Sequence, residues 1–271
     1  MNESTVKYLA GLIDSDGSIS FNFNNPNKDK SAYTLSLKVS IASSNAVDFH
    51  GFIASLPGLT GFGSVDRHGD KRQFTRWTVT SRSDLEMLAP RLVKHMFTKA
   101  KHLQRMLEKW REMRGRLISV DECNALREFS RASRCDTGPL KPKNFPSWGW
   151  LSGYLDGNGC FRSSRCKSGT YKGKQMYRQQ CSVQAACHIG DVLVLEFIQR
   201  AHGGYIKKHS KSDNCMVWER NLGKSDRSFA LSFLPRLVRH SKIKKHKIEQ
   251  LIAFHHQQRL NEQTSTDEAI V

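Results

Sequence analysis

One pattern that occurs twice constrains the fold of this chain more than any other feature. It reads LAGLIDSDG from Leu9 and LSGYLDGNG from Leu151, so that small residues stand among apolar ones and acidic or amide residues follow. Glycine within a helix allows another backbone to approach closely. We therefore expect two helices that pack against each other, with Asp16 and Asn158 close together at the C-terminal ends.

Further blocks recur in the same order and at nearly the same spacing as the two motifs. Trp77 corresponds to Trp218, and APRLVKHMFTKAKHLQRML from Ala89 corresponds to LPRLVRHSKIKKHKIEQLI from Leu234. A duplicated structural unit explains this order better than chance. The expected organisation is an N-terminal unit over residues 1–115, a linker over 116–146, a C-terminal unit over 147–256 and a flexible tail over 257–271.

The period of the apolar residues changes in the same order within each unit. Apolar and polar residues alternate in SISFNFN and in YTLSLKVSIA, which predicts strands with one buried and one polar face. The first unit has expected strands at 18–24, 33–42, 63–69 and 74–81, a helix at 47–56, and helical residues at 83–113 with an interruption near Pro90. The second has expected strands at 160–166, 177–186, 204–208 and 215–220, a helix at 191–201, and a helix from 228 onward. Ser119 and Glu122 form a capping-box pattern that predicts a linker helix.

The charge of the chain points to a polyanionic partner. Its formal net charge is +18 and its pI is about 9.8, more than solubility requires, although a solvated basic surface is the alternative. No window approaches the roughly 20 apolar residues of a membrane span, and the N-terminus lacks a secretory-signal pattern. The seven cysteines lack the paired short spacings of a zinc site and are interpreted as reduced thiols. We expect an intracellular protein, and similar numbers of Lys and Arg favour a bacterial cytoplasm or a plastid over a mitochondrion.

The paired motifs and the order of the flanking elements resemble the LAGLIDADG homing endonuclease family, in its monomeric two-motif form, over about residues 5–255. The resemblance implies an α+β fold of two pseudo-symmetric αββαββα units packed through the motif helices. Each unit would lay a four-stranded antiparallel sheet into the major groove of double-stranded DNA. The last acid of each motif would bind a divalent cation beside a scissile phosphate. Mg²⁺ would support cleavage, and another divalent cation such as Mn²⁺ or Ca²⁺ could occupy the site in a complex that does not cleave.

The resemblance carries over to particular residues. Asp16 is implied as a metal ligand, and Asn158 holds the corresponding place in the second motif, where its amide oxygen brings no negative charge. The backbone carbonyls before them, those of Ser15 and Gly157, are further candidate ligands. The earlier acids of the two motifs, Asp14 and Asp156, are expected to be structural. Two basic residues, Lys99 and Lys244, are the candidates for stabilising charge on the phosphate or polarising water. Ser43 and Cys187 stand where the family often has a glutamine, so water positioning by that route is not expected.

The polar faces of the predicted strands are expected to read DNA. Arg, Asn, Gln and Lys can hydrogen-bond to base edges in the major groove, and the basic clusters KAKHLQR and KIKKHK are expected to follow phosphates. In the first unit the candidates are Ser20, Asn22, Asn24, Ser36, Lys38, Ser40 and, more weakly, Arg76. In the second unit they are Arg162, Ser164, Arg178, Gln180, Ser182, Gln184 and, more weakly, Tyr205 and Lys207.

The sequence thus predicts a monomeric, site-specific homing DNA endonuclease, encoded by a mobile intron or intein-like element, that makes a metal-dependent staggered cut in a long asymmetric target. Asn158 leaves open a nicking or inactive form. It also leaves open a different class of protein: a non-cleaving DNA-binding relative, or a maturase that assists splicing of intron RNA. Whether Asn158 is natural or was introduced to trap an uncut complex is equally open.

Overall fold

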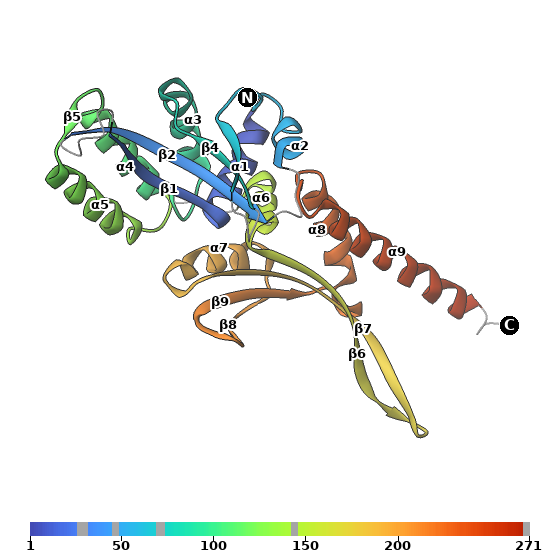
Figure 1. The fold of residues 1–271 in the computed structure, drawn as a ribbon. Helices are drawn as coiled ribbons and strands as arrows, with labels where there is room; N and C mark the ends of the chain where they lie inside the picture. The colour runs from blue at the N-terminus through green and yellow to red at the C-terminus, as the bar shows by residue number, and fades with distance from the viewer. Residues whose placement is uncertain (26–31, 45–48, 69–73, 142–145, 268–271) are drawn as a thin grey trace.

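The first half of the chain forms an antiparallel sheet flanked by helices (Figure 1). The computed structural model describes residues 1–25, 32–44, 49–68, 74–141 and 146–267. The strands of this sheet lie in the order β1-β2-β4-β3, and a short fifth strand pairs with β2. They are β1 (Gly17–Asn24), β2 (Tyr33–Ser44), β3 (Ser64–His68), β4 (Phe74–Val79) and β5 (Leu117–Ile118).

The second half repeats this sheet. Its strands lie in the order β6-β7-β9-β8, which is the order of the first four strands. They are β6 (Gly159–Tyr171), β7 (Lys174–His188), β8 (Tyr205–His209) and β9 (Ser212–Asn221). The β6–β7 hairpin is longer than predicted and projects away from the body of the molecule (Figure 1). The predicted fold class, two repeated units with antiparallel sheets, is confirmed.

The helices follow the same repeat. In the first half they are α1 (Glu3–Asp16), α2 (Phe49–Ala54), α3 (Arg82–His95), α4 (Ala100–Met113) and α5 (Val120–Arg134). In the second half they are α6 (Trp148–Asn158), α7 (Val192–His202), α8 (Arg227–Val238) and α9 (Lys245–Asp267), with short 3-10 turns before α7 and α8. No helix among the described residues is both long and apolar enough to cross a membrane.

The two motif helices, α1 and α6, pack against each other at the centre of the molecule (Figure 1). A Cβ added at Gly11 would lie 1.9 Å from the carbonyl oxygen of Trp150, and one added at Gly153 would lie 2.0 Å from that of Tyr8. Real atoms cannot approach so closely, so only glycine fits at these two positions. The predicted helix contact is confirmed.

A buried tryptophan shows that the two units repeat in detail. Trp77 and Trp218 have no exposed surface and lie on the equivalent strands β4 and β9. The Nε1 of Trp77 donates to the carbonyl of Phe62 at 2.9 Å, and that of Trp218 donates to the carbonyl of Gly203 at 2.8 Å. Each indole therefore ties its strand to the loop before the adjacent edge strand.

Three helix boundaries differ from the prediction. The interruption in the first unit lies at 96–99, between α3 and α4, and α3 runs through the exposed Pro90. The helix expected from 228 onward breaks between α8 and α9. Helix α9 continues to Asp267, whereas the tail was expected to lose structure after 256.

Residues of the predicted linker pack on the first unit. The capping box is present, because Ser119 Oγ accepts from Glu122 N and the Glu122 carboxylate accepts from Ser119 N. Strand β5 pairs with β2, and the Arg127 guanidinium of α5 lies 5.1 Å from the ring centroid of Phe23 in β1. Residues 117–134 thereby extend the first sheet and cover part of it.

Candidate functional site

The C-terminal ends of α1 and α6 meet. A Cβ at Gly157 would lie 2.0 Å from Ser15 Oγ and 3.1 Å from Asp16 Oδ2. Part of the Asp16 side chain reaches solvent, and Asn158 is partly buried beside Tyr154, to which its side chain is hydrogen-bonded. The last residues of both motifs therefore lie at one place between the two units.

The first acid of the N-terminal motif is a structural anchor. Asp14 is buried, and its carboxylate accepts from Phe97 N at 2.5 Å, from Lys99 N at 2.9 Å and from Trp150 Nε1 at 2.8 Å. Burial raises the pKa of Asp14 against the opposing effect of these hydrogen bonds. The backbone donors lie between α3 and α4, so Asp14 explains why the helix breaks there and not at Pro90.

Asp156, the first acid of the second motif, is the corresponding structural anchor of the second unit. Its carboxylate accepts from Ser241 Oγ at 2.6 Å and from three consecutive backbone nitrogens at 2.7–3.0 Å, those of residues 242–244. Tyr8 Oη of the other motif helix also donates to it, at 2.7 Å. Asp156 thus holds the break between α8 and α9, and each motif acid takes an aromatic donor from the opposite helix.

The two candidate lysines cap the motif helices. Lys99 Nζ donates to the carbonyls of Ile13, Ser15 and Gly17 at 2.7, 3.3 and 2.8 Å. Lys244 Nζ repeats this at 2.9, 2.8 and 2.7 Å, with the carbonyls of Leu155, Gly157 and Gly159. The Ile13 and Leu155 carbonyls also accept from the backbone nitrogens of Gly17 and Gly159, whereas the later carbonyls at a helix end have no partner within the helix, and the lysines satisfy these.

These lysines set the electrostatics of the helix ends. Burial lowers the pKa of Lys99, and Asp14, Asp16 and Asp191 oppose that shift. Burial likewise lowers the pKa of Lys244, opposed by Asp156 and Asp16. Desolvation raises the pKa of Asp16, and the ammonium groups of Lys244 and Lys99 oppose it. Asp16 is therefore electrostatically coupled to the lysines of both units.

The donors at the helix ends fit a hard divalent cation. They are the Asp16 carboxylate, the Asn158 amide oxygen and the carbonyls of Ser15 and Gly157, which also accept from the lysines but have two lone pairs each. Within the described part of the chain, no three His, Cys, Asp or Glu side chains gather closely enough to hold an ion by themselves. Mg²⁺ is usually held by one or two carboxylates together with substrate phosphates and water. This donor set therefore suits a cation whose shell a nucleic-acid phosphate completes.

Most predicted DNA-contacting residues share one face of each sheet. The register pairs Ser20 with Lys38 and Asn22 with Ser36 in the first sheet, and Arg162 with Ser182 and Ser164 with Gln180 in the second. The side chains that reach solvent, fully or in part, are Ser20, Asn22, Asn24, Ser36, Lys38, Arg76, Arg162, Ser164, Gln180, Tyr205 and Lys207. The side chains of Arg178 and Ser43 lie outside the described ones.

Three residues expected on the wet face are buried: Ser40, Ser182 and Gln184. All three lie on β2 or β7, which have a paired strand on each side. Ser40 is flanked by Ser18 and Thr78, and Gln184 by Cys160 and Glu219. Side chains on the two flanking strands cover the short serines and the glutamine of a central strand. The alternation of polar and apolar residues alone therefore overestimated the exposure of these three side chains.

An acidic residue that the sequence reasoning missed engages two of the candidates on β8. Glu219 is buried and forms an ion pair with Lys207, whose Nζ lies 5.4 Å from the ring centroid of Tyr205. Burial alone would raise the pKa of Glu219, but hydrogen bonds from Lys207, Gln184 and Tyr205 hold it below its usual value. The Lys207 ammonium is thus already paired with a carboxylate of the same sheet. An acid on a predicted DNA face carries no sequence signal that would have identified this role.

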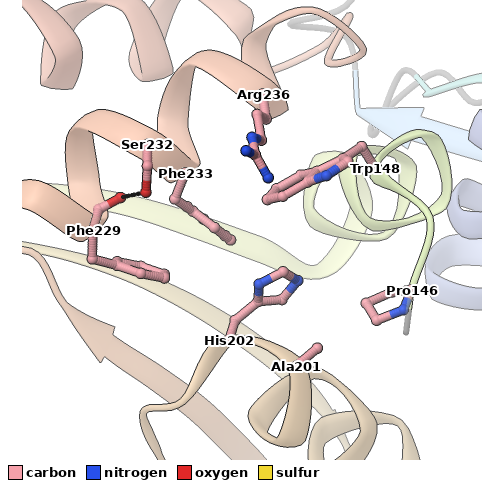
Figure 2. Close-up of a pocket in the computed structure, with 8 residues that line it drawn as sticks. All are labelled: Pro146, Trp148, Ala201, His202, Phe229, Ser232, Phe233 and Arg236. Carbon is pink, nitrogen blue, oxygen red and sulfur yellow. Dashed lines mark hydrogen bonds between the residues drawn. The ribbon is translucent and has the colours of Figure 1, made fainter. Parts of the chain in front are cut away.

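A separate cavity of about 310 Å³ lies at the other end of α6. Figure 2 shows the His202 ring between Trp148 and Phe233, with ring centroids 5.2 and 5.1 Å away, and the Arg236 guanidinium lies 5.5 Å from the Trp148 ring centroid. Burial lowers the pKa of His202 to about 4. The eight residues that line this cavity include none of the predicted site residues. The candidate site is instead the open meeting point of the motif helices.

Comparison with known proteins identifies relatives of this arrangement. The LAGLIDADG endonuclease family model matches residues 9–113 and 151–227, more than half of the chain. No curated protein sequence matches. I-SmaMI bound to uncleaved DNA with calcium ions superposes with a TM-score of 0.71 at 18% identity, covering 97% of this chain and 93% of that one. I-AabMI bound to uncleaved DNA gives 0.68 at 15% identity, covering 96% and 92%. I-GzeII in complex with its DNA target gives 0.66 at 15%, covering 97% and 92%. At these identities the likeness shows a shared two-unit fold.

Proposed function

Because the chain belongs to the LAGLIDADG endonuclease family, we propose that it is a site-specific DNA endonuclease that acts as a monomer on one long asymmetric target. The observation that carries the proposal is the meeting of the two motif-helix ends, each capped by its own lysine, with Asp16 coupled to both lysines. Two equivalent helix ends at one point suit two cuts, one in each strand of a duplex.

Recognition would come from the exposed polar residues of the two sheets. Asn22 and Asn24 in the first sheet, and Arg162 and Gln180 in the second, are exposed and of the types that hydrogen-bond to base edges. The net charge of +18 favours the phosphate backbone and would make binding strongly dependent on salt. The relatives named above hold DNA in their structures, and no observation above favours intron RNA as the partner.

Cleavage would take place where the helix ends meet. A divalent cation held by Asp16 and Asn158, with the carbonyls of Ser15 and Gly157, would lower the pKa of the attacking water and neutralise the leaving oxygen. The buried ammonium groups of Lys99 and Lys244 hold the helix ends in place and add positive charge beside the scissile phosphates. The product would be a staggered break.

Asn158 is expected to weaken cleavage but not DNA binding. Asp at this position would add one negative charge for the cation, and the same charge would repel the phosphates. We therefore propose that this chain binds its target at least as tightly as an Asn158→Asp variant does, while it cuts more slowly or nicks one strand.

A cleavage assay tests the proposal. Target sequences are first selected by binding from a randomised DNA library, and supercoiled plasmid carrying the selected site is then incubated with Mg²⁺. Asn158→Asp should produce a double-strand break, and Asp16→Asn added to it should abolish cutting. Asn124→Asp, which places the same charge on the exposed face of α5, is the matched control and should change neither rate.

Three results separate the alternatives. Failure to select any sequence would reject site-specific DNA binding. Selection without cutting, even by Asn158→Asp, would identify a DNA-binding relative that does not cleave. Rapid cutting of both strands by the chain as it stands, with no gain from Asn158→Asp, would overturn the role given to Asn158.

A further inference from the structure

The cavity at the start of α6 is built by three helices of the second unit. The start of α6 contributes Trp148, and the end of α7 contributes His202. Helix α8 turns one face toward the cavity, since residues three and four positions apart lie on the same side of a helix. The residues on that face are Phe229, Ser232, Phe233 and Arg236. The enclosed space of about 310 Å³ is large enough for a small organic ligand.

The walls of this cavity are largely aromatic. Three aromatic side chains and the His202 ring line it (Figure 2). The centroid of the Phe233 ring lies 5.5 Å from that of Trp148 and 4.9 Å from that of Phe229. Aromatic side chains are the surfaces on which nucleobases stack in proteins that bind unpaired nucleotides.

Arg236 adds a positive charge to this aromatic wall. Its guanidinium lies 5.5 Å from the Trp148 ring centroid, and the residue is exposed. No carboxylate pairs with it in the described part of the chain, and none of the residues that line the cavity is acidic. The cavity therefore favours a ligand that carries negative charge, and a guanidinium binds phosphate or carboxylate oxygens well.

The first unit has no such arrangement at the equivalent place. Arg91 matches the arginine of the cavity across the repeat, but it donates to the Met1 carbonyl at 3.1 Å and lies 3.9 Å from a carboxylate oxygen of Glu3. The same alignment places Asp84 and Leu88 at the positions of the two phenylalanines. The duplicated scaffold thus requires neither the aromatic wall nor an arginine without an acidic partner.

His202 offers hydrogen bonds that the chain does not use. Neither of its ring nitrogens has a hydrogen-bond partner among the described residues, and Nε2 is buried. Burial lowers the pKa of His202 to about 4, so at neutral pH the ring is uncharged and has one donor and one acceptor. An unpartnered polar group inside a protein costs free energy, and a ligand that bonds to this ring removes part of that cost.

We propose that this cavity binds a nucleoside monophosphate, with the base against the rings of Trp148 and Phe233 and the phosphate on Arg236. A free nucleotide and the 5′-phosphorylated end of a single strand present the same chemistry. The cavity lies at the start of α6, and Asn158 lies at its end, about 15 Å away along the helix. The site is therefore separate from the helix ends, and the inference does not depend on the proposed cleavage.

The test is calorimetric titration of the full chain with AMP, and with adenosine and ribose 5-phosphate, which lack the phosphate and the base. Salt at about 0.3 M screens weak binding of phosphate to the other basic surfaces. Arg236→Gln removes the charge, and His202→Phe keeps a ring between its neighbours but removes the nitrogens. Arg200→Gln is the matched control, because it removes a charge from an exposed position of α7 that does not line the cavity.

We expect one AMP per chain and a raised melting temperature, with adenosine and ribose 5-phosphate each bound at least about tenfold more weakly. Arg236→Gln should weaken AMP about tenfold and leave adenosine unchanged. His202→Phe should weaken AMP without lowering the melting temperature, since an apolar ring replaces an unpartnered polar one. Arg200→Gln should bind AMP as the unaltered chain does.

The remaining outcomes also decide the matter. Absence of AMP binding, or ribose 5-phosphate bound as tightly as AMP, would overturn the inference. So would unchanged AMP affinity in Arg236→Gln, or displacement of AMP by a selected duplex in Ca²⁺, which would place the nucleotide on the DNA-binding face.

A 5′-phosphorylated single-stranded tetranucleotide distinguishes the two sources of the ligand. Tighter binding than AMP would identify the end of a strand, and weaker binding a free nucleotide; either result supports the site. Failure to select any DNA target would reject the proposed function and leave the AMP titrations as they are.

Discussion

The two units agree where they hold the fold and differ where they would meet DNA and metal. Both carry a buried tryptophan bonded to a loop carbonyl, a motif acid that holds a helix break, and a lysine on three motif-helix carbonyls. At the end of the motif, however, one unit has Asp16 and the other Asn158. The contacts that position the site are duplicated, so the chemistry at each helix end can diverge without loss of the scaffold.

The predicted phosphate-contacting clusters differ as well. In the first unit, Lys101 and Arg105 form ion pairs with Asp136, at 3.1 and 2.8 Å. In the second, Lys242, in the break before α9, and Lys247, in the first turn of α9, are exposed. A basic residue with an acidic partner offers less to a phosphate, so the second cluster should contribute more of the salt dependence of DNA binding.

The largest expected effect tests whether the central contact is symmetric. Gly11→Ala and Gly153→Ala each place a Cβ within about 2 Å of a carbonyl oxygen of the opposite helix, so each should lower the free energy of unfolding by about 3 kcal/mol or more. Denaturant unfolding measures this loss. Gly223→Ala is the control, because a Cβ there meets no atom within 4 Å. A loss confined to one of the two motif variants would show that the helices can shift apart on that side.

Local pattern was sufficient to predict much of this scaffold. The alternation of Ile19, Phe21 and Phe23 with polar residues marked β1, and the Ser119–Glu122 pair marked the start of α5, because each signal involves neighbours in sequence. The duplication then extended each local prediction to the other unit. The contact between the two motif helices was predicted from their glycines, because a helix with glycine at this place allows another backbone to approach closely.

Features set by distant residues were not accessible in this way. The break at 96–99 depends on a carboxylate more than 80 residues earlier, and Pro90 was the stronger local signal. The burial of Ser40 and Gln184 depends on strands that pair on both sides. The family resemblance and the match across the repeats indicated the two lysines, but their hydrogen bonds to three carbonyls each depend on how the helices meet.

The second-largest expected effect is the pH dependence of stability, which we compare between the two units at their buried histidines. His102 links Ser133 Oγ at 2.7 Å and the Ile19 carbonyl at 3.3 Å, and burial lowers its pKa from 6.5 to about 4. Well above pH 6.5 the histidine is neutral in both the folded and the unfolded chain. Below it the unfolded chain binds a proton that the folded chain does not, so stability should fall by about 2 kcal/mol between pH 7 and pH 5.

His202 in the second unit shifts in the same direction, to about 4, but it borders an open cavity and should contribute less. Urea unfolding at several pH values should therefore show that His102→Gln flattens the pH dependence more than His202→Gln does. His256→Gln, at an exposed position, should leave the slope as it is. Equal flattening by the two buried variants would mean that the units are alike in this respect.

The smallest effect concerns the aromatic donors that cross between the motif helices. Tyr8→Phe removes one hydrogen bond to Asp156 and leaves that carboxylate with Ser241 Oγ and three backbone donors. The expected cost is about 1 kcal/mol, since a hydrogen bond within a satisfied cluster contributes little net.

Trp150→Phe should cost more, because Asp14 then retains two backbone donors and a buried ring becomes smaller. Denaturant unfolding of both variants, with Tyr33→Phe as the control on a strand, measures the difference. If Tyr8→Phe lowered the free energy of unfolding as much as Trp150→Phe, the number of hydrogen-bond donors left to each carboxylate would not determine the cost of the two substitutions. The similarity of the units would then extend from their geometry to their energetics.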